Sequence, residues 1–240
     1  MALDGSSGDL SGDIRAEEIL AALDNDQRAV ALATRGPVCV IAGAGTGKTR
    51  AITHRIAYAA AIGTMDPQKV LALTFTSRAA GEMRTRLRSL GVPTVAARTI
   101  HAAALKQLIY FWPTVFGGRV PELMTAKAGF IGEAINRAGL SGELRATSRE
   151  LMRDIASEIE WAKVSQVSPE DFATEIDKRI QKPRVSTDKL AKVYAAYESV
   201  KKQELAIDFE DVLLLTAAMI EEERIVRERV QDQYRYFTID

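Results

Sequence analysis

Cysteine is almost absent from this sequence, and long apolar runs are missing. The 240 residues include one cysteine, Cys39, so an internal disulfide is excluded and neither zinc nor redox chemistry is indicated. Because Cys39 lies in an apolar segment, we expect it to be a small core residue. No stretch approaches the roughly 18 apolar residues of a spanning helix, and no basic start precedes an apolar run. These absences favour a cytoplasmic protein without a membrane partner.

Net charge is also missing, because 32 basic residues balance 32 acidic ones. A balanced chain does not coat nucleic acid through bulk charge. The charges are unevenly distributed, however, since residues 76–106 carry six basic side chains and one acidic side chain. A local basic strip is therefore compatible with the sequence.

The N-terminal half alternates between two kinds of segment. Residues 1–14 are rich in Gly, Ser and Asp and are expected to form a flexible tail, after which residues 15–22 have the apolar spacing of a short helix. Residues 37–42 form a β-branched run typical of a buried strand, and residues 47–62 carry an apolar helical stripe. This order predicts a strand, a glycine loop and a helix.

Two further strand-like segments, 69–76 and 94–100, flank an amphipathic helix. Alternating strands and helices predict an α/β fold, in which helices cover both faces of a parallel sheet. Beyond His101 the sequence has helical spacing and no convincing strand until residues 234–239.

This change of pattern predicts two domains. Residues 15–103 plus 206–240 are expected to form the α/β domain. Residues 104–205 are expected to form an all-helical subdomain inserted into it.

The loop after the first predicted strand carries AGAGTGKTR, Ala42 to Arg50. A glycine-rich loop before a helix directs backbone N–H groups and the positive end of the helix dipole at one point, which suits a polyphosphate. Lys48 would reach the terminal phosphates, and the Thr49 hydroxyl would bind Mg²⁺. A dinucleotide motif would need glycine where Lys48 stands. The alternative, a chance tripeptide on a surface loop, is disfavoured by the flanking strand and helix.

Five motifs together resemble the N-terminal part of the UvrD/Rep/PcrA group of superfamily 1 DNA helicases, nearest to its actinobacterial branch. They occur in the order of that family and span nearly the whole chain. The motifs are LDNDQRAV (23–30), AGAGTGKTR (42–50), ALTFTSRAAGEM (72–83), RTIHAAAL (98–105) and IDFEDVLL (207–214). The resemblance implies a RecA-like P-loop NTPase domain, called 1A, with an inserted helical subdomain, called 1B.

The resemblance also implies a nucleotide site for ATP and Mg²⁺. Gln27 would read the adenine edge, and the Arg50 guanidinium would pack on the base. For both side chains a solvated helix face remains the alternative. The catalytic residues implied are Lys48 and Asp240, and the Mg²⁺ ligands are Thr49 and Asp240. The predicted nucleotide contacts are Gln27, Ala44, Gly45, Thr46, Gly47, Lys48, Thr49 and Arg50.

A single-stranded DNA track is implied by a second group of residues. Phe75 would stack on bases, and Thr76 at a helix N-terminus would bind a phosphate. Arg78 and His101 would be further DNA contacts. Phe75 could instead belong to the core, and His101 could be a local cap. The acidic residues of IDFEDVLL, although clustered, are not assigned a metal.

The strand at 236–239 runs into Asp240, where the resemblance implies that a catalytic glutamate should follow. We therefore expect an N-terminal fragment, inactive alone, of an ATP-driven helicase. Such a helicase moves 3′ to 5′ on single-stranded DNA and unwinds single-strand/duplex junctions in repair or replication. Its partner would be the second RecA-like domain of its own parent chain. The rival interpretations are another P-loop NTPase or kinase, and a nucleic-acid-binding module with a vestigial nucleotide site.

Overall fold

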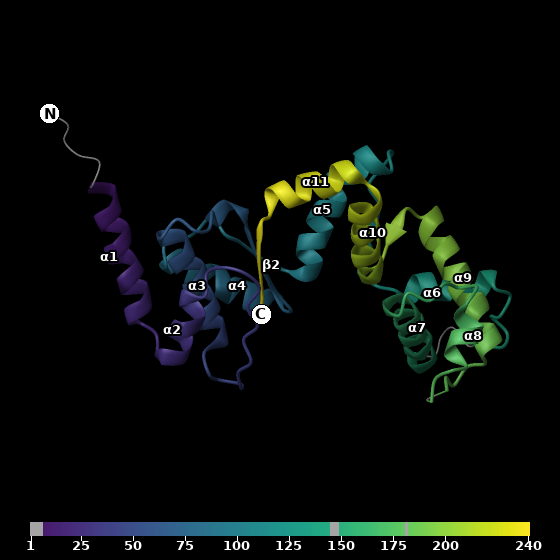
Figure 1. Cartoon of the computed structure of the whole chain (residues 1–240). Coiled ribbons are helices and arrows are strands. Elements are labelled where there is room, and N and C mark those ends of the chain that lie inside the picture. Colours follow the sequence, from purple (N-terminus) through teal and green to yellow (C-terminus); the bar gives the residue numbers. More distant parts are fainter. Residues whose placement is uncertain (1–6, 145–148, 181) are drawn as a thin grey trace. The chain divides into compact units, whose positions relative to one another are not determined.

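The structure is a computed structural model that describes residues 7–144, 149–180 and 182–240 (Figure 1). It contains two compact units. The first unit comprises the described residues up to Ala103 together with Glu223–Asp240, and the second comprises the described residues of Ala104–Glu222.

The first unit holds a parallel sheet and the helices around it. Its elements are α1 (Ser7–Ala21), α2 (Asn25–Leu32), α3 (Lys48–Ala61), a 3₁₀ turn (Pro67–Lys69), β1 (Val70–Thr74), α4 (Ser77–Ser89), β2 (Ala96–Thr99), α11 (Arg224–Gln233) and β5 (Tyr236–Ile239). Helix α5 (Ile100–Val115) continues from β2 into the second unit.

The sheet has the order β2-β1-β5, and both pairings are parallel. Leu71 of β1 lies opposite Ala96 of β2 and opposite Phe237 of β5. The strands that pair are far apart in sequence, as the crossovers of an α/β fold require. The prediction of a parallel sheet flanked by helices is confirmed.

One face of this sheet packs on α3 and α4. Val70 and Ala72 of β1 project into a buried cluster with helix residues that recur every three to four positions, which is the spacing of one helix face. The helix members of the cluster are Ile52, Ile56, Ala57 and Ala59 of α3 and Met83 and Leu87 of α4. This packing fixes where α3 and α4 begin relative to the strand ends.

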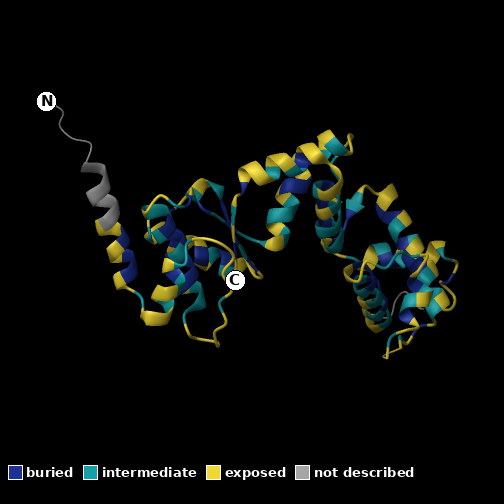
Figure 2. Ribbon diagram, viewed as in Figure 1, coloured by how far each residue is buried: buried dark blue, intermediate teal, exposed yellow. Residues whose placement is uncertain are grey.

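The strand predicted at residues 37–42 is not formed, and this prediction is wrong. The segment has no ladder partner among the described residues, and Ile41 is 96 % exposed. Figure 2 shows by colour which parts of the chain are buried and which are exposed. Cys39 is exposed as well, so it is not the core residue that we expected. A β-branched run becomes a strand only where a neighbouring strand forms hydrogen bonds with its backbone. Here the carbonyls of Ala42 and Gly43 accept hydrogen bonds from Lys48 instead.

The flexible tail predicted at residues 1–14 also needs correction. Residues 1–6 lie outside the described residues, but α1 begins at Ser7. Ala16, Ile19 and Leu20 of α1 are buried, and α1 packs against α3. The helix therefore starts earlier than the glycine-rich composition suggested.

The second unit is mainly helical. Its elements after α5 are β3 (Glu122–Leu123), α6 (Ala128–Arg137), α7 (Arg149–Val164), α8 (Phe172–Ile176), α9 (Thr187–Gln203), β4 (Ala206–Ile207) and α10 (Phe209–Glu222). Its core joins α6, α7, α8 and α9 through side chains such as Ile135, Ile159, Phe172 and Tyr197. Among the described residues of the chain, we find no helix with the length and apolar character needed to cross a membrane.

Two predictions about this unit are corrected. It is not all-helical, because β3 and β4 form a short parallel pair in which Glu122 lies opposite Ala206. It also extends to Glu222, so residues 206–222 do not belong to the sheet domain as predicted. Residues 206–222 are held in this unit because β4 pairs with β3 and the Thr216 hydroxyl of α10 contacts the Ala104 carbonyl at 3.3 Å.

A buried ionic cluster provides the stronger reason. The ammonium groups of Lys163 (α7) and Lys201 (α9) lie 2.9 and 3.0 Å from one carboxylate oxygen of Asp208, which is fully buried. Asp211 also contacts both lysines, and Glu198 lies 3.1 Å from Lys163 and 2.9 Å from Lys201. Asp208 and Asp211 cap each other's backbone N–H groups at the start of α10. The cluster thereby joins α7, α9 and α10.

This cluster explains the acidic residues of IDFEDVLL. Glu198, Asp208 and Asp211 are close enough together to share a metal ion, but the two lysine ammonium groups lie among their oxygens. Burial alone would raise the pKa of Asp208, yet Lys163 and Lys201 hold that pKa well below its usual range. Glu210 points elsewhere and pairs with Lys127 at 2.8 Å.

We expect the second unit to lose stability in acid. A carboxyl whose pKa is depressed by folding stabilises the fold above its unfolded pKa of about 4, and this contribution is lost as the pH falls toward the folded pKa. Both tryptophans, Trp112 and Trp161, lie in this unit, so urea titrations followed by tryptophan fluorescence report on it. The free energy of unfolding should fall steadily below about pH 4, and Asp208→Asn should flatten that dependence. An unchanged pH dependence in Asp208→Asn would contradict this assignment.

Candidate nucleotide-binding site

The glycine loop bends sharply into α3. Gly45 and Gly47 have φ values of +79° and +84°, which side-chain-bearing residues rarely adopt. A Cβ on Gly47 would lie 2.5 Å from the Nε2 atom of Gln27, so the loop also needs glycine for close approach. The Thr46 hydroxyl donates to the Gly43 carbonyl at 2.9 Å and closes the loop on itself. Helix α3 then begins at Lys48 and has no side-chain cap on its first N–H groups.

Gln27 is held against this loop. Its Nε2 atom donates to the Thr46 carbonyl at 3.1 Å. Asp24, which we did not predict, accepts a hydrogen bond from the Gln27 backbone N–H at 2.8 Å and so caps α2. The signal for Asp24 was present, because an acidic residue three positions before a glutamine is a capping pattern. The cap fixes where Gln27 stands on the loop.

Lys48 folds back over the loop. Its ammonium donates to the carbonyls of Ala42 and Gly43 at 3.0 and 2.8 Å. An ammonium has three N–H donors, so one donor remains for another acceptor. The positive charge therefore lies directly beside the glycines.

Thr49 and Asp240 meet although 191 positions separate them in sequence. The Thr49 hydroxyl donates to a carboxylate oxygen of Asp240 at 2.7 Å. The Asp240 N–H is bound to the Leu73 carbonyl at 2.9 Å, which continues the pairing of β5 with β1. One hydroxyl and one carboxylate, both hard oxygen donors, thus lie together at the N-terminus of α3.

Arg50 points toward the end of α1, where its guanidinium donates to the Ala22 carbonyl at 2.5 Å. Ala44 and the other loop residues up to Thr46 are exposed. A cavity of about 710 Å³ lies beside the loop and is lined by Gln27, Thr46, Gly47 and Lys48. Val30 and Ala33 of the α2 region supply apolar surface to the same cavity. This volume is in the range of sites for small organic ligands.

The predicted DNA contacts lie where β1 ends. Phe75 is 88 % exposed, so the alternative that it belongs to the core is wrong. Thr76 caps α4, since its hydroxyl accepts from the Ala79 N–H at 3.1 Å. Arg78 is exposed and pairs with Glu82 at 3.0 Å within the same helix.

His101 follows the neighbouring strand. The ends of β1 and β2 are in register, with Thr74 opposite Thr99, and α5 begins at Ile100. His101 is half-buried, and the Thr99 hydroxyl, not His101, accepts the Ala102 N–H as a cap at 3.1 Å. Phe75, His101 and Asp240 therefore all follow the carboxyl ends of adjacent parallel strands. This edge is where ligands of open α/β sheets bind.

This sequence is similar to known proteins over nearly its whole length. The "ATP-dependent DNA helicase UvrD2" of Mycobacterium tuberculosis is 45 % identical over 238 residues, which cover 95 % of this chain and 33 % of that protein. The "ATP-dependent DNA helicase PcrA" of Leuconostoc citreum is 31 % identical over 230 residues, covering 93 % of this chain and 29 % of that protein. The chain thus spans about a third of the length of these relatives.

A more distant relative and a family profile show the same similarity. The PcrA helicase of Bacillus subtilis is 28 % identical over 227 residues. The sequence profile of the "UvrD/REP helicase N-terminal domain" matches residues 23–240, which include the glycine loop, the exposed Phe75 and the final strand. The chain therefore belongs to the UvrD/REP helicase N-terminal domain family.

Proposed function

We propose that this chain is the N-terminal, nucleotide-binding part of an ATP-dependent DNA helicase. In this proposal it binds ATP with Mg²⁺ and takes part in 3′-to-5′ movement along single-stranded DNA. The observation that carries the proposal is the contact between Thr49 and Asp240 beside the glycine loop. Family membership supports it, because the relatives are named ATP-dependent DNA helicases.

The residues at the loop fit a magnesium-bound triphosphate. Mg²⁺ prefers hard oxygen ligands, which the Thr49 hydroxyl and the Asp240 carboxylate supply. Uncapped N–H groups of α3 and the Lys48 ammonium lie beside them, and both favour phosphate oxygens. When bound, Mg²⁺ neutralises charge that develops on the phosphates during hydrolysis. The role of Lys48 is to hold the terminal phosphates by direct charge-assisted hydrogen bonds.

Replacement of Thr49 tests the metal half of this site. In calorimetry with a non-hydrolysable ATP analogue, Mg²⁺ should strengthen binding to the unchanged chain. Thr49→Val keeps the side-chain volume but removes the hydroxyl, so it should abolish most of the Mg²⁺-dependent gain, about tenfold, while binding without Mg²⁺ persists. Thr85→Val, on the exposed side of α4, is the control and should change nothing. An unaltered Mg²⁺ effect in Thr49→Val would remove Thr49 from the metal site.

We also propose that the strand-end residues bind single-stranded DNA. An exposed aromatic ring can stack on any base, and Phe75 lies next to Thr76, which caps the start of α4. The same sheet edge carries Asp240 and His101. Nucleotide and DNA would therefore be bound by neighbouring strand ends, a placement that supports coupling between the two ligands.

Phe75→Ala should weaken binding of a fluorescently labelled oligothymidine. Stacking on one base contributes about 1–3 kcal/mol, so the affinity should fall at least about fivefold. Phe75→Trp retains a ring and should keep most of the binding. Because Phe75 is exposed, neither substitution should lower the melting temperature measurably. Equal DNA affinity for Phe75→Ala and the unchanged chain, measured by anisotropy at low salt, would remove Phe75 from the DNA track.

A further inference from the structure

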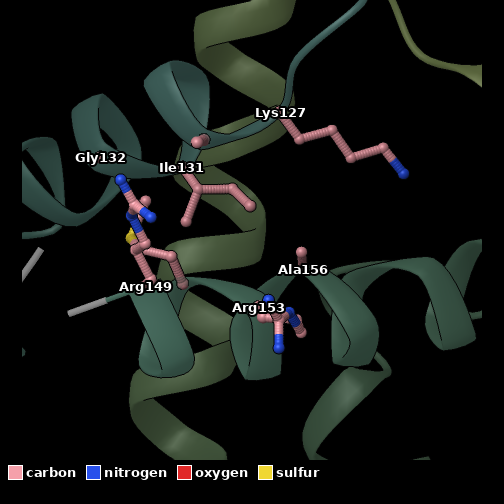
Figure 3. Close-up of a pocket in the computed structure, with 8 residues that line it drawn as sticks. Lys127, Ile131, Gly132, Arg149, Arg153 and Ala156 are labelled. Carbon is pink, nitrogen blue, oxygen red and sulfur yellow. The ribbon is translucent and has the colours of Figure 1, made fainter.

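A second cavity, unrelated to the glycine loop, lies within the mainly helical unit. It has a volume of about 480 Å³ and lies between the first turn of α6 and one face of α7 (Figure 3). Ile131, Met152 and Ala156 give it an apolar floor, and Arg149 and Arg153 stand at its side. We call it the α6–α7 pocket.

The two arginines of this pocket have no ion-pair partner among the residues that the structure describes. They lie one turn apart on α7, and both are exposed. The acidic side chains of the same helix are engaged elsewhere. Glu150 and Asp154 pair with Arg184, whereas Glu160 pairs with Lys127 at 2.7 Å. The guanidinium groups at the pocket are therefore available to an anionic ligand.

Lys127, the third basic residue at the pocket, is paired with carboxylates, unlike the two arginines. Figure 3 shows its side chain directed away from Arg149 and Arg153. Its ammonium lies between Glu160 and Glu210, at 2.7 and 2.8 Å. Burial alone would lower the pKa of Lys127, but these two carboxylates raise it. Lys127 is thus neutralised by its own unit and adds no free charge to the pocket.

Gly132 leaves the pocket open. It lies inside α6, where glycine costs about 0.5–1 kcal/mol relative to alanine. Its backbone conformation does not require glycine, and an added Cβ would meet only the Met152 methyl, at an ordinary 3.9 Å. A longer side chain at this position would extend into the pocket toward Met152.

We propose that the α6–α7 pocket binds an acidic peptide segment of a partner protein. An apolar side chain of the peptide rests on Ile131, Met152 and Ala156, and flanking carboxylates bind Arg149 and Arg153. Arginine and carboxylate form paired, charge-assisted hydrogen bonds. The N-terminus of α6 has no side-chain cap, so it adds positive potential at the same place.

A concave apolar floor favours a peptide over a DNA duplex. Phosphate contacts need basic groups on an accessible surface and gain nothing from an apolar cavity. Peptide-binding grooves combine an apolar pocket that seats one side chain with a few charged groups that fix orientation. The α6–α7 pocket has this combination, independently of whether the first unit binds nucleotide.

The test uses the whole chain and a labelled peptide in which a Leu-Phe pair is flanked on both sides by aspartates. By fluorescence anisotropy, the unchanged chain should bind this peptide. A peptide with the same charge but with Ser-Ser in place of Leu-Phe should bind at least about fivefold more weakly. Arg149→Ala with Arg153→Ala should weaken binding of the Leu-Phe peptide by about tenfold or more.

Two further variants separate the pocket from general charge effects. Gly132→Leu fills the pocket without changing charge and should also weaken binding by about tenfold. Lys178→Ala with Lys189→Ala removes the same positive charge from the same unit, outside the pocket and without releasing an acidic side chain of α7, and should retain binding.

Three results would overturn the proposal. The first is no binding of the Leu-Phe peptide by the unchanged chain at millimolar concentration. The second is an equal loss of binding in the Lys178/Lys189 variant. The third is a short DNA duplex that binds more tightly than the peptide and loses its affinity in the Arg149/Arg153 variant.

Discussion

Lys48→Ala should weaken binding of a non-hydrolysable ATP analogue by about ten- to a hundredfold. The expected size follows from the loss of charge-assisted hydrogen bonds to phosphate, each of which contributes about 1.5–3 kcal/mol. Lys48 is well placed for this role because its ammonium already lies over the loop, 2.8 Å from the Gly43 carbonyl. Calorimetry with Mg²⁺ measures the effect directly.

Lys69→Ala is the matched control. Lys69 belongs to the same unit but precedes β1, at the amino end of the sheet, and pairs with the exposed Asp232 at 3.4 Å. It should bind the analogue as the unchanged chain does. Equal affinity of Lys48→Ala and Lys69→Ala would show that phosphates do not lie at the glycine loop. In a full-length helicase that contains this domain, Lys48→Ala should slow hydrolysis on the order of a hundredfold or more.

Lys163→Met should destabilise the second unit by about 3–5 kcal/mol. The side chain of Lys163 is 3 % exposed and its ammonium lies among the carboxylates of Asp208, Asp211 and Glu198. Removal of this ammonium leaves three carboxylates with Lys201 alone, and a buried charge without its partner is far more costly than the pair itself is favourable. Urea unfolding followed by tryptophan fluorescence reports the change.

The control is Lys178→Met, which removes an ammonium from an exposed pair with Glu175 in the same unit. Such surface pairs contribute about 0–1 kcal/mol. The double variant Lys163→Met with Asp208→Asn should lose less stability than the sum of the two single substitutions. Each single substitution leaves a buried charge without its partner, whereas the double variant removes both charges of the pair. A loss below 1 kcal/mol for Lys163→Met, or strict additivity, would show that the cluster does not hold α7, α9 and α10 together.

The sequence was most informative where one short segment determines its own geometry. The glycine loop, the helix after it and the helix that begins after Thr76 depend on residues within a few positions, and the expected residue types stand there. The five motifs added the family, and with it the pairing of Thr49 with Asp240, which no local pattern could reveal.

The errors arose where structure depends on distant partners. Residues 37–42 have the composition of a strand but pair with no strand among the described residues, and the carbonyl of Ala42 accepts a hydrogen bond from Lys48. The sequence pattern predicts that residues 206–222 belong to the sheet domain, yet they are held in the second unit by lysines some 7 to 48 positions away. A two-residue strand such as β3 has no detectable periodicity. The α6–α7 pocket likewise lies between two helices, and the spacing of residues in the sequence does not predict how these helices pack against each other.

The most direct test of the account is an experimental structure of this chain with a non-hydrolysable ATP analogue and Mn²⁺ in place of Mg²⁺. We predict phosphate oxygens on the N–H groups of Gly45 to Thr49, the Lys48 ammonium on the terminal phosphates, and an anomalous Mn²⁺ signal between the Thr49 hydroxyl and the Asp240 carboxylate. A nucleotide bound away from the glycine loop, or a metal ion that contacts neither Thr49 nor Asp240, would contradict the account.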